Sequence, residues 1–206
     1  MTTWLISSTF YGQWLPGNAR GSITNVHDKR TGDEETTARI EHDVPGEDYE
    51  EAMPQLERAA RERLKGPPVC VDLDKAEELL AQFQETARYR GWELLAVSIM
   101  FNHVHLVVAA PTDVGKSQLL RDFKSYGARR LNQQFGPQPA GTWWTESGSC
   151  RPVRNVAAAN FYVCHRQPRP LVVWSKERGR ISPDESDPSN VFGESASEPP
   201  ASEPPA

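Results

Sequence analysis

The sequence predicts an α+β protein built on an antiparallel sheet. Apolar residues recur at helical spacing over residues 72–90 and 117–135, and short runs with strand-like character precede and separate these segments. The expected order of strand, helix, strand, strand, helix, strand and helix is typical of a ferredoxin-like sandwich with one helix added. We therefore expect helices on one face of the sheet and an added C-terminal helix, which carries Tyr162.

The first strand is expected at the N-terminus. The run from Thr2 to Pro16 begins as a β-rich segment and breaks at residues 16–18. Residues 25–56 are acidic and poor in apolar groups, so we interpret the region of about 25–60 as a mobile loop or insertion.

The centre of the chain predicts a helix followed by a hairpin. An aspartate cap begins the helix at residues 72–90, and Gly91 ends it. Trp92 to Met100 is expected to form a strand, which a tight turn at residues 101–102 joins to the next strand.

The C-terminal half predicts a second helix, a strand and a last helix. The second helix spans residues 117–135, a strand lies within residues 142–153, and Asn155 caps a helix that ends near Arg166. Two copies of the sequence SEPPA follow, which predicts a disordered tail at residues 181–206. We expect residues 1–180 to form a single domain.

The run IMFNHVHLVVAAP contains a pair of histidines in a strand pattern. Successive strand side chains point to opposite faces, so His103 and His105 share one face while Val104 points to the other. Two neighbouring imidazoles can chelate a metal ion, although an isolated His-x-His is more often a pair of surface histidines.

The charge of the chain is distributed unevenly. The formal net charge is -5, yet residues 117–180 hold eleven Lys/Arg against three Asp/Glu, whereas residues 181–206 hold six Asp/Glu and no Lys/Arg. A basic half of this kind is compatible with a polyanionic partner. The three cysteines show no paired metal spacing, and no apolar run is long enough to cross a bilayer. These features favour a cytoplasmic protein with no membrane contact.

Several segments together resemble a known family, the single-tyrosine HUH transposases. This family includes the IS200-like insertion-sequence transposases and the REP-associated tyrosine transposases of bacteria, and the resemblance covers the chain from Thr2 to about Trp174. The segments that carry it are YGQWLPGNARGS (11–22), NHVHLVV (102–108), FKSYGARRLN (123–132), WTESGSCRPV (144–153) and NVAAANFYVCHRQ (155–167).

The resemblance implies a metal-dependent nuclease and strand transferase. His103 and His105 would hold Mg2+ or Mn2+, and Tyr162 would attack the phosphate to give a 5'-phosphotyrosine. Gln167 is the candidate third ligand. Five residues from Tyr162 correspond to about 140° around an ideal helix, so His165 stays as the alternative.

Further residues have candidate roles. Tyr126 is the competing nucleophile, but the match aligns Tyr162 with the catalytic position. One of Trp143 and Trp144 could stack on an unpaired base, because adjacent strand residues face opposite ways. The expected phosphate contacts are Lys124, Arg129, Arg130, Arg151 and Arg154.

The expected partner is single-stranded or hairpin DNA in the bacterial cytoplasm, in association with the nucleoid. Whether the protein acts as a monomer or a homodimer stays open. The alternative is a domesticated or inactive nucleic-acid-binding protein of the same fold. A third hypothesis is an interaction protein that binds through its acidic insertion and tail.

Overall fold

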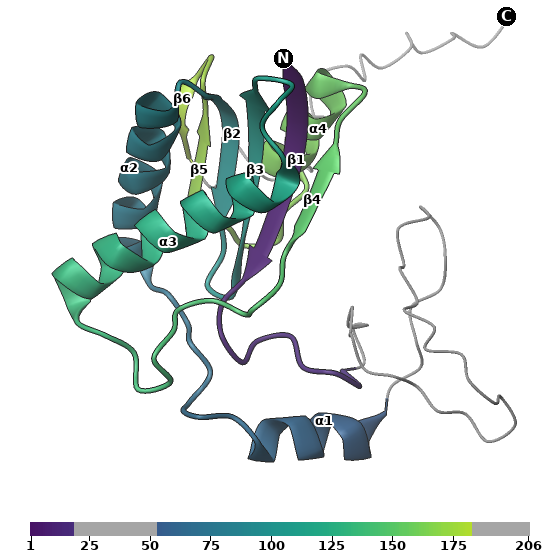
Figure 1. The fold of residues 1–206 in the computed structure, drawn as a ribbon, viewed down its shortest axis with the longest axis vertical. Coiled ribbons are helices and arrows are strands. Elements are labelled where there is room, and N and C mark those ends of the chain that lie inside the picture. The colour runs from purple at the N-terminus through teal and green to yellow at the C-terminus, as the bar shows by residue number, and fades with distance from the viewer. Residues whose placement is uncertain (19–52, 183–206) are drawn as a thin grey trace, which may run out of the picture.

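The computed structural model describes residues 1–18 and 53–182, and within them one antiparallel sheet carries helices on both faces (Figure 1). The six strands lie in the order β4-β1-β3-β2-β5-β6. In chain order, the strands are β1 (Thr2–Thr9), β2 (Glu93–Ile99), β3 (His103–Ala110), β4 (Ser149–Pro152), β5 (Val172–Ser175) and β6 (Gly179–Ile181). The helices are α1 (Pro54–Glu62), α2 (Leu73–Arg90), α3 (Lys116–Phe135) and α4 (Val156–His165). The predicted α+β class with an antiparallel sheet is confirmed.

Three elements were not predicted from the sequence. Strands β5 and β6 extend the sheet beside β2, and α1 occupies the end of the region interpreted as a loop. Helix α1 begins with a proline in its first turn. A proline is tolerated there because the first backbone amides of a helix have no hydrogen-bond partner within the helix. Helix α1 has no buried residue, and this explains why an apolar pattern does not reveal it. Residues 25–52 of the predicted insertion and residues 183–206 of the predicted disordered tail lie outside the described residues. The expected start of the tail at residue 181 is wrong, because Ile181 ends β6 and is buried.

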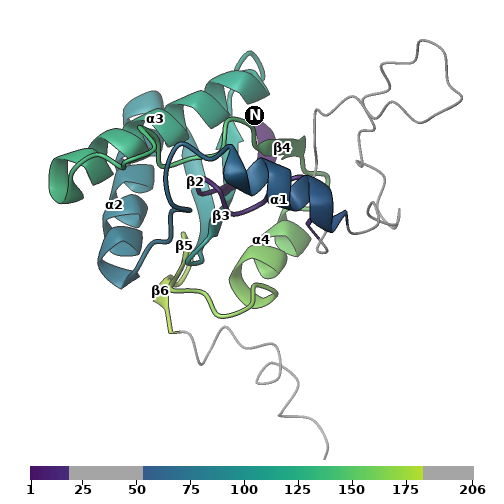
Figure 2. The same ribbon diagram turned by 90° about the horizontal axis from the view of Figure 1, so that it is seen from below.

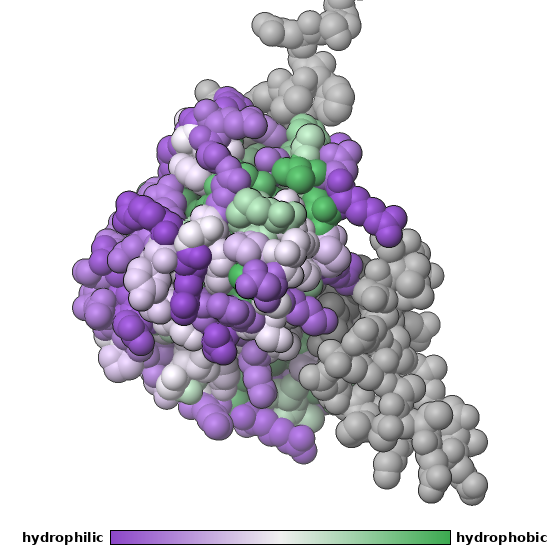
Figure 3. All heavy atoms as spheres, turned by 45° about the horizontal axis from the view of Figure 1, so that its top comes forward, coloured by the Kyte–Doolittle hydropathy of each residue, from purple (hydrophilic) through white to green (hydrophobic). Residues whose placement is uncertain are grey.

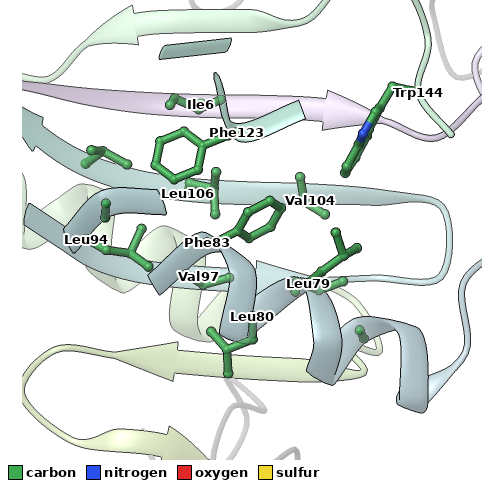
Figure 4. Close-up of a cluster of buried hydrophobic side chains, with 14 of the residues drawn as sticks. Ile6, Leu79, Leu80, Phe83, Leu94, Val97, Val104, Leu106, Phe123 and Trp144 are labelled. Atoms are coloured by element: carbon green, nitrogen blue, oxygen red, sulfur yellow. The ribbon is translucent and has the colours of Figure 1, made fainter. Parts of the chain in front are cut away.

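The main core lies between the sheet and helices α2 and α3. Figure 4 shows Leu79 and Phe83 of α2 and Phe123 of α3 pointing toward Val104 and Leu106 of β3. The rings of Phe83 and Phe123 meet edge to face, with centroids 5.7 Å apart. This face of the sheet is therefore sealed by apolar packing.

The opposite face of the sheet is covered by α4. Val163 and Cys164 of α4 are buried against Ala96 of β2, Val107 of β3 and Val173 of β5. This apolar cluster is smaller than the core on the other face of the sheet. His103 and His105, at the start of β3, are not part of it. The face of β3 that carries His103 and His105 therefore lies beside α4.

Helix α1 lies beyond the end of the sheet at which β1 ends and β3 begins (Figures 1 and 2). The loop after β1 holds it there, because the Met53 amide donates to the Gly17 carbonyl at 2.9 Å. Gly17 has a positive φ of 80°, and a Cβ atom at this position would lie 2.4 Å from the Met53 carbonyl oxygen. A glycine is therefore required where α1 joins this loop.

The face of the molecule shown in Figure 3 is mainly polar, and its apolar residues gather chiefly in the upper part of the view. Among the described residues, no helix has the length and apolarity that crossing a membrane requires.

The position of the core predicts that two aromatic residues of α2 contribute very differently to the free energy of unfolding. Phe83→Ala removes a ring that is 1% exposed, so we expect a loss of about 3–5 kcal/mol in the free energy of unfolding. Tyr89→Ala, which removes a ring that is 75% exposed, should change it by less than about 0.5 kcal/mol. Urea unfolding followed by circular dichroism measures both, and equal losses would contradict the assigned core.

Candidate active site

The alternation of β3 places His103 and His105 on the face that α4 covers. His105 lies directly opposite Ser7 of β1 on one side and Ser98 of β2 on the other. The centroids of the two imidazole rings are 5.0 Å apart. The predicted pair is therefore one compact group on the central strand of the sheet.

Each histidine is held through the same ring nitrogen. Nδ1 of His103 lies 2.6 Å from the amide oxygen of Asn102, and Nδ1 of His105 lies 2.7 Å from the Ser7 hydroxyl. An amide oxygen only accepts, so Nδ1 of His103 carries the proton and Nε2 keeps its lone pair. If His105 likewise donates from Nδ1 to Ser7, both Nε2 atoms can bind a metal ion, with the polar partners orienting the rings.

The imidazoles are neutral at pH 7. Burial lowers the pKa of His103 to about 4. Burial, together with repulsion from the charged form of His103, lowers the pKa of His105 to about 3. Neutral imidazole is the form that ligates metals, so the protonation state fits a metal site.

Tyr162 lies next to the histidines. Its helix begins at Asn155, whose side chain accepts a hydrogen bond from the Ala158 amide at 3.0 Å. The Tyr162 and His105 ring centroids are 5.6 Å apart, and Tyr162 remains 42% exposed. Its phenol thus combines contact with the histidine pair and access from solvent.

Tyr126, the competing nucleophile, lies on the other side of the sheet. It belongs to α3, and its ring packs under the guanidinium groups of Arg90 and Arg129. The two tyrosines are therefore separated by the sheet, and the geometry associates only Tyr162 with the histidine pair.

The two candidates for the third ligand, Gln167 and His165, lie at the C-terminal end of α4. Helix α4 ends at His165, so the angle calculated for a continuing helix does not apply to Gln167. Gln167 is 8% exposed, and its amide nitrogen donates to the Tyr162 carbonyl at 3.1 Å. The His165 ring packs on Phe161 at 5.2 Å. Within residues 1–18 and 53–182, no group of three His, Cys, Asp or Glu side chains could hold a metal ion.

Sequence reasoning missed three neighbours of the histidines. Ser7 and Asn102 hold the imidazoles, and the Trp14 ring meets the His103 ring edge-on, with centroids 5.8 Å apart. Asn102 directly precedes His103 in the sequence, and this adjacency could have identified it as a partner of the His103 ring. Ser7 and Trp14 required the register of β1 against β3, which the sequence does not specify.

The five predicted phosphate contacts are divided between the two faces of the sheet. Lys124, Arg129 and Arg130 belong to α3, whereas Arg151 lies on β4 and Arg154 directly precedes the α4 cap. Arg151 is paired with Leu5, which packs against the α4 side of the sheet. Arg151 and Arg154 are both exposed and lie on or next to the side that carries the histidines.

The α3 cations already have partners in the protein. The Lys124 ammonium donates to the carbonyls of Thr145, Glu146 and Ser147 at 2.6, 3.0 and 3.2 Å, and burial lowers its pKa. Arg130 is paired with Glu78 at 2.6 Å. These contacts give both side chains a structural role.

The expectation that Trp143 or Trp144 offers a stacking surface is not met. Their residues are 1% and 4% exposed, and both precede strand β4. Trp144 stacks on Phe10 with centroids 4.7 Å apart, and the Trp143 indole donates to Asn132 at 2.7 Å. Both indoles are core residues because the chain folds back over α3 before the strand begins.

The fold and this group of side chains define a mixed α+β protein with paired histidines and a tyrosine on one sheet face. Comparison with known proteins indicates a family. Residues 69–162, the central part of the chain, match the family described as "Transposase IS200 like". The resemblance to the tyrosine transposases is thereby confirmed.

Solved structures similar to this chain include two transposases. A putative transposase from Deinococcus radiodurans is 17% identical with a TM-score of 0.43, and the match covers 76% of this chain and 82% of that one. A REP-associated tyrosine transposase bound to a REP hairpin is 13% identical with a TM-score of 0.39, covering 80% and 63%. No curated protein matches the chain significantly.

The contacts of Lys124 predict that its substitution affects stability. Lys124→Met leaves three carbonyls without their donor, so we expect unfolding to become easier by about 1–3 kcal/mol. Arg129→Gln on the same helix removes an exposed charge and should change stability by less than about 0.5 kcal/mol. Equal, small effects in urea unfolding would show that Lys124 is not structural.

Proposed function

We propose that this transposase-family protein is a single-strand DNA endonuclease and strand transferase that uses Tyr162 as its nucleophile. The observation that carries this proposal is the contact between the Tyr162 ring and His105 on the α4 side of the sheet. A nucleophile beside a candidate metal site is the arrangement that phosphodiester cleavage requires.

His103 and His105 would hold Mg2+ or Mn2+ through their Nε2 atoms. The bound cation would polarise the scissile phosphate and reduce its repulsion of a nucleophile. Two imidazoles alone do not satisfy these ions, which prefer oxygen ligands. The Gln167 amide nitrogen is engaged with the Tyr162 carbonyl, so its amide oxygen would be the third protein ligand, with a phosphate oxygen completing the set.

Tyr162 would act as a phenoxide after losing its proton. Its oxygen forms a bond to phosphorus, the bond from phosphorus to the 3' oxygen breaks, and that oxygen takes up a proton. The products are a 5'-phosphotyrosine and a free 3' hydroxyl. Because the new phosphodiester keeps the bond energy, a second 3' hydroxyl can rejoin the strand without ATP.

Single-stranded or hairpin DNA is the proposed substrate. Arg151 and Arg154 are the predicted cations on or next to the His103 and His105 side, so they are the first candidates to contact phosphates beside the cleavage position. Of the predicted cations on the other side, Arg129 would contact a separate part of the DNA, whereas Lys124 and Arg130 are engaged within the protein. We propose that residues 1–180 act as the functional domain.

The proposed role of Tyr162 predicts the outcome of a covalent trapping assay. Wild-type protein incubated with labelled single-stranded DNA and Mn2+ should give an adduct that survives denaturing electrophoresis. Tyr162→Phe should abolish the adduct while DNA binding persists, because the ring is kept and only the nucleophilic oxygen is lost.

Tyr126→Phe is the matched control, since it removes the hydroxyl of the competing tyrosine on α3. It should leave adduct formation intact. DNA binding by the wild-type protein without any adduct would favour the non-cutting, domesticated alternative, and an adduct that depends on Tyr126 would overturn the assignment of the nucleophile.

The two serines that flank His105 allow a sharp test of the metal site. Ser7→Ala removes the hydroxyl that holds Nδ1 of His105, so we expect Mn2+ affinity to fall about 10-fold to 100-fold in isothermal titration calorimetry. Ser98→Ala is the control, because that hydroxyl donates to the Met100 sulfur instead. Equal effects of both substitutions would contradict the proposed orientation of His105.

A further inference from the structure

We propose that helix α1 and the residues just after it form a binding surface for the phosphate backbone of single-stranded DNA next to the histidine pair. We call this surface, made by Arg58, Arg61, Arg63 and Lys65, the α1 cation row. The inference deepens the proposed function and rests on it for the identity of the strand. The row adds a positioning surface outside residues 69–162, the segment that matches the transposase family.

The charge of this surface is opposite to that of the sequence around it. The four cations of the row are exposed, and Glu62 is the exposed anion between them. Residues 28–52, which precede the row, are strongly acidic. A charge averaged along the chain therefore does not reveal the positive charge of the row. A solvent-facing group of cations with a single exposed anion is complementary to a polyanion.

The row is fixed in position by contacts on the inner side of the helix. The Asn18 amide donates to Glu57 at 3.1 Å, and the backbone amide of Lys65 donates to the Tyr11 hydroxyl at 2.7 Å. Leu56 and Leu64 lie against the glycines of the loop after β1. The cations are therefore presented from a braced element, which reduces the entropy lost when they bind a phosphate chain.

The same loop connects the row to the histidines. Residues 11–18 contact α1 on one side, and within them Trp14 meets the His103 ring at a centroid distance of 5.8 Å. Both views place α1 beyond the end of the sheet where β3 begins with His103 (Figures 1 and 2). A strand with its scissile phosphate at Tyr162 and His105 can therefore continue past His103 and Trp14 onto α1.

The dimensions of the row suit a few nucleotides. Arg58 and Arg61 are three residues apart in α1, which is about 4.5 Å along the helix axis, and Arg63 and Lys65 follow directly after the helix ends. Such a short cationic surface can neutralise a few phosphates and carries no base-reading groups of its own. It would position the strand flanking the cut independently of sequence.

The test measures the salt dependence of binding to a single-stranded oligonucleotide. Arg58→Gln combined with Arg63→Gln removes two cations and leaves Arg61, which is paired with Glu57 at 2.8 Å. If each lost residue contacts one phosphate, the slope of log affinity against log salt should become shallower by about 1.4. Glutamine keeps helix propensity close to that of arginine, so α1 should remain folded.

Two control proteins make the result specific. Arg88→Gln with Lys116→Gln removes two exposed cations elsewhere and should leave the slope unchanged. Arg58→Lys with Arg63→Lys should keep the wild-type slope, because the charge is retained. An unchanged slope in the Arg58/Arg63 glutamine variant, or an equal loss in the Arg88/Lys116 variant, would overturn the inference.

Failure of this inference is distinguishable from failure of the proposed function. If wild-type protein forms the tyrosine adduct and the glutamine variant keeps its slope, α1 does not bind the strand and Tyr162 chemistry stands. If the slope changes as expected but no adduct forms, α1 binds single-stranded DNA in a protein that does not cut it. Absence of single-strand binding by wild-type protein would reject both.

Discussion

The register of β3 between β1 and β2 is the constraint on which the rest of the structure depends. Val104 and Leu106 point to the large core beneath α2 and α3, so His103 and His105 must point to the α4 side. A slip of one residue would bury the imidazoles in the apolar core and expose the valine and the leucine. Because burial of these apolar side chains contributes about 1.5–3 kcal/mol each, core packing also fixes where the histidines lie.

The two faces of the sheet make different contributions to the protein. The α2 and α3 side supplies stability, and its cations are engaged by carbonyls and by Glu78. The α4 side has a smaller apolar cluster and leaves polar groups at the start of β3, where Ser7 and Asn102 hold the imidazoles through Nδ1. The site thus combines rigid support from a central strand with a tyrosine on a helix that is open to solvent.

Much of this arrangement follows from local sequence patterns, and the exceptions have physical causes. The periodicity of α2 and α3 and the alternation around His103 are local, so these elements were predictable. Strand β5 is four residues long and β6 three, which is too short for a clear period. The pairing of Ser7 with His105 joins residues 98 positions apart, and only tertiary structure determines it. The acidic composition before residue 53 concealed the basic helix that follows.

The proposed chemistry requires the two Nε2 atoms to face a common metal position beside Tyr162. The most direct test is the anomalous scattering of Mn2+ in crystals of the protein with single-stranded DNA. We expect one Mn2+ peak within coordination distance of Nε2 of both His103 and His105, with the Tyr162 oxygen directed at the phosphate. A Mn2+ peak away from both histidines, or no peak in crystals that contain the DNA at Tyr162, would contradict the proposed chemistry.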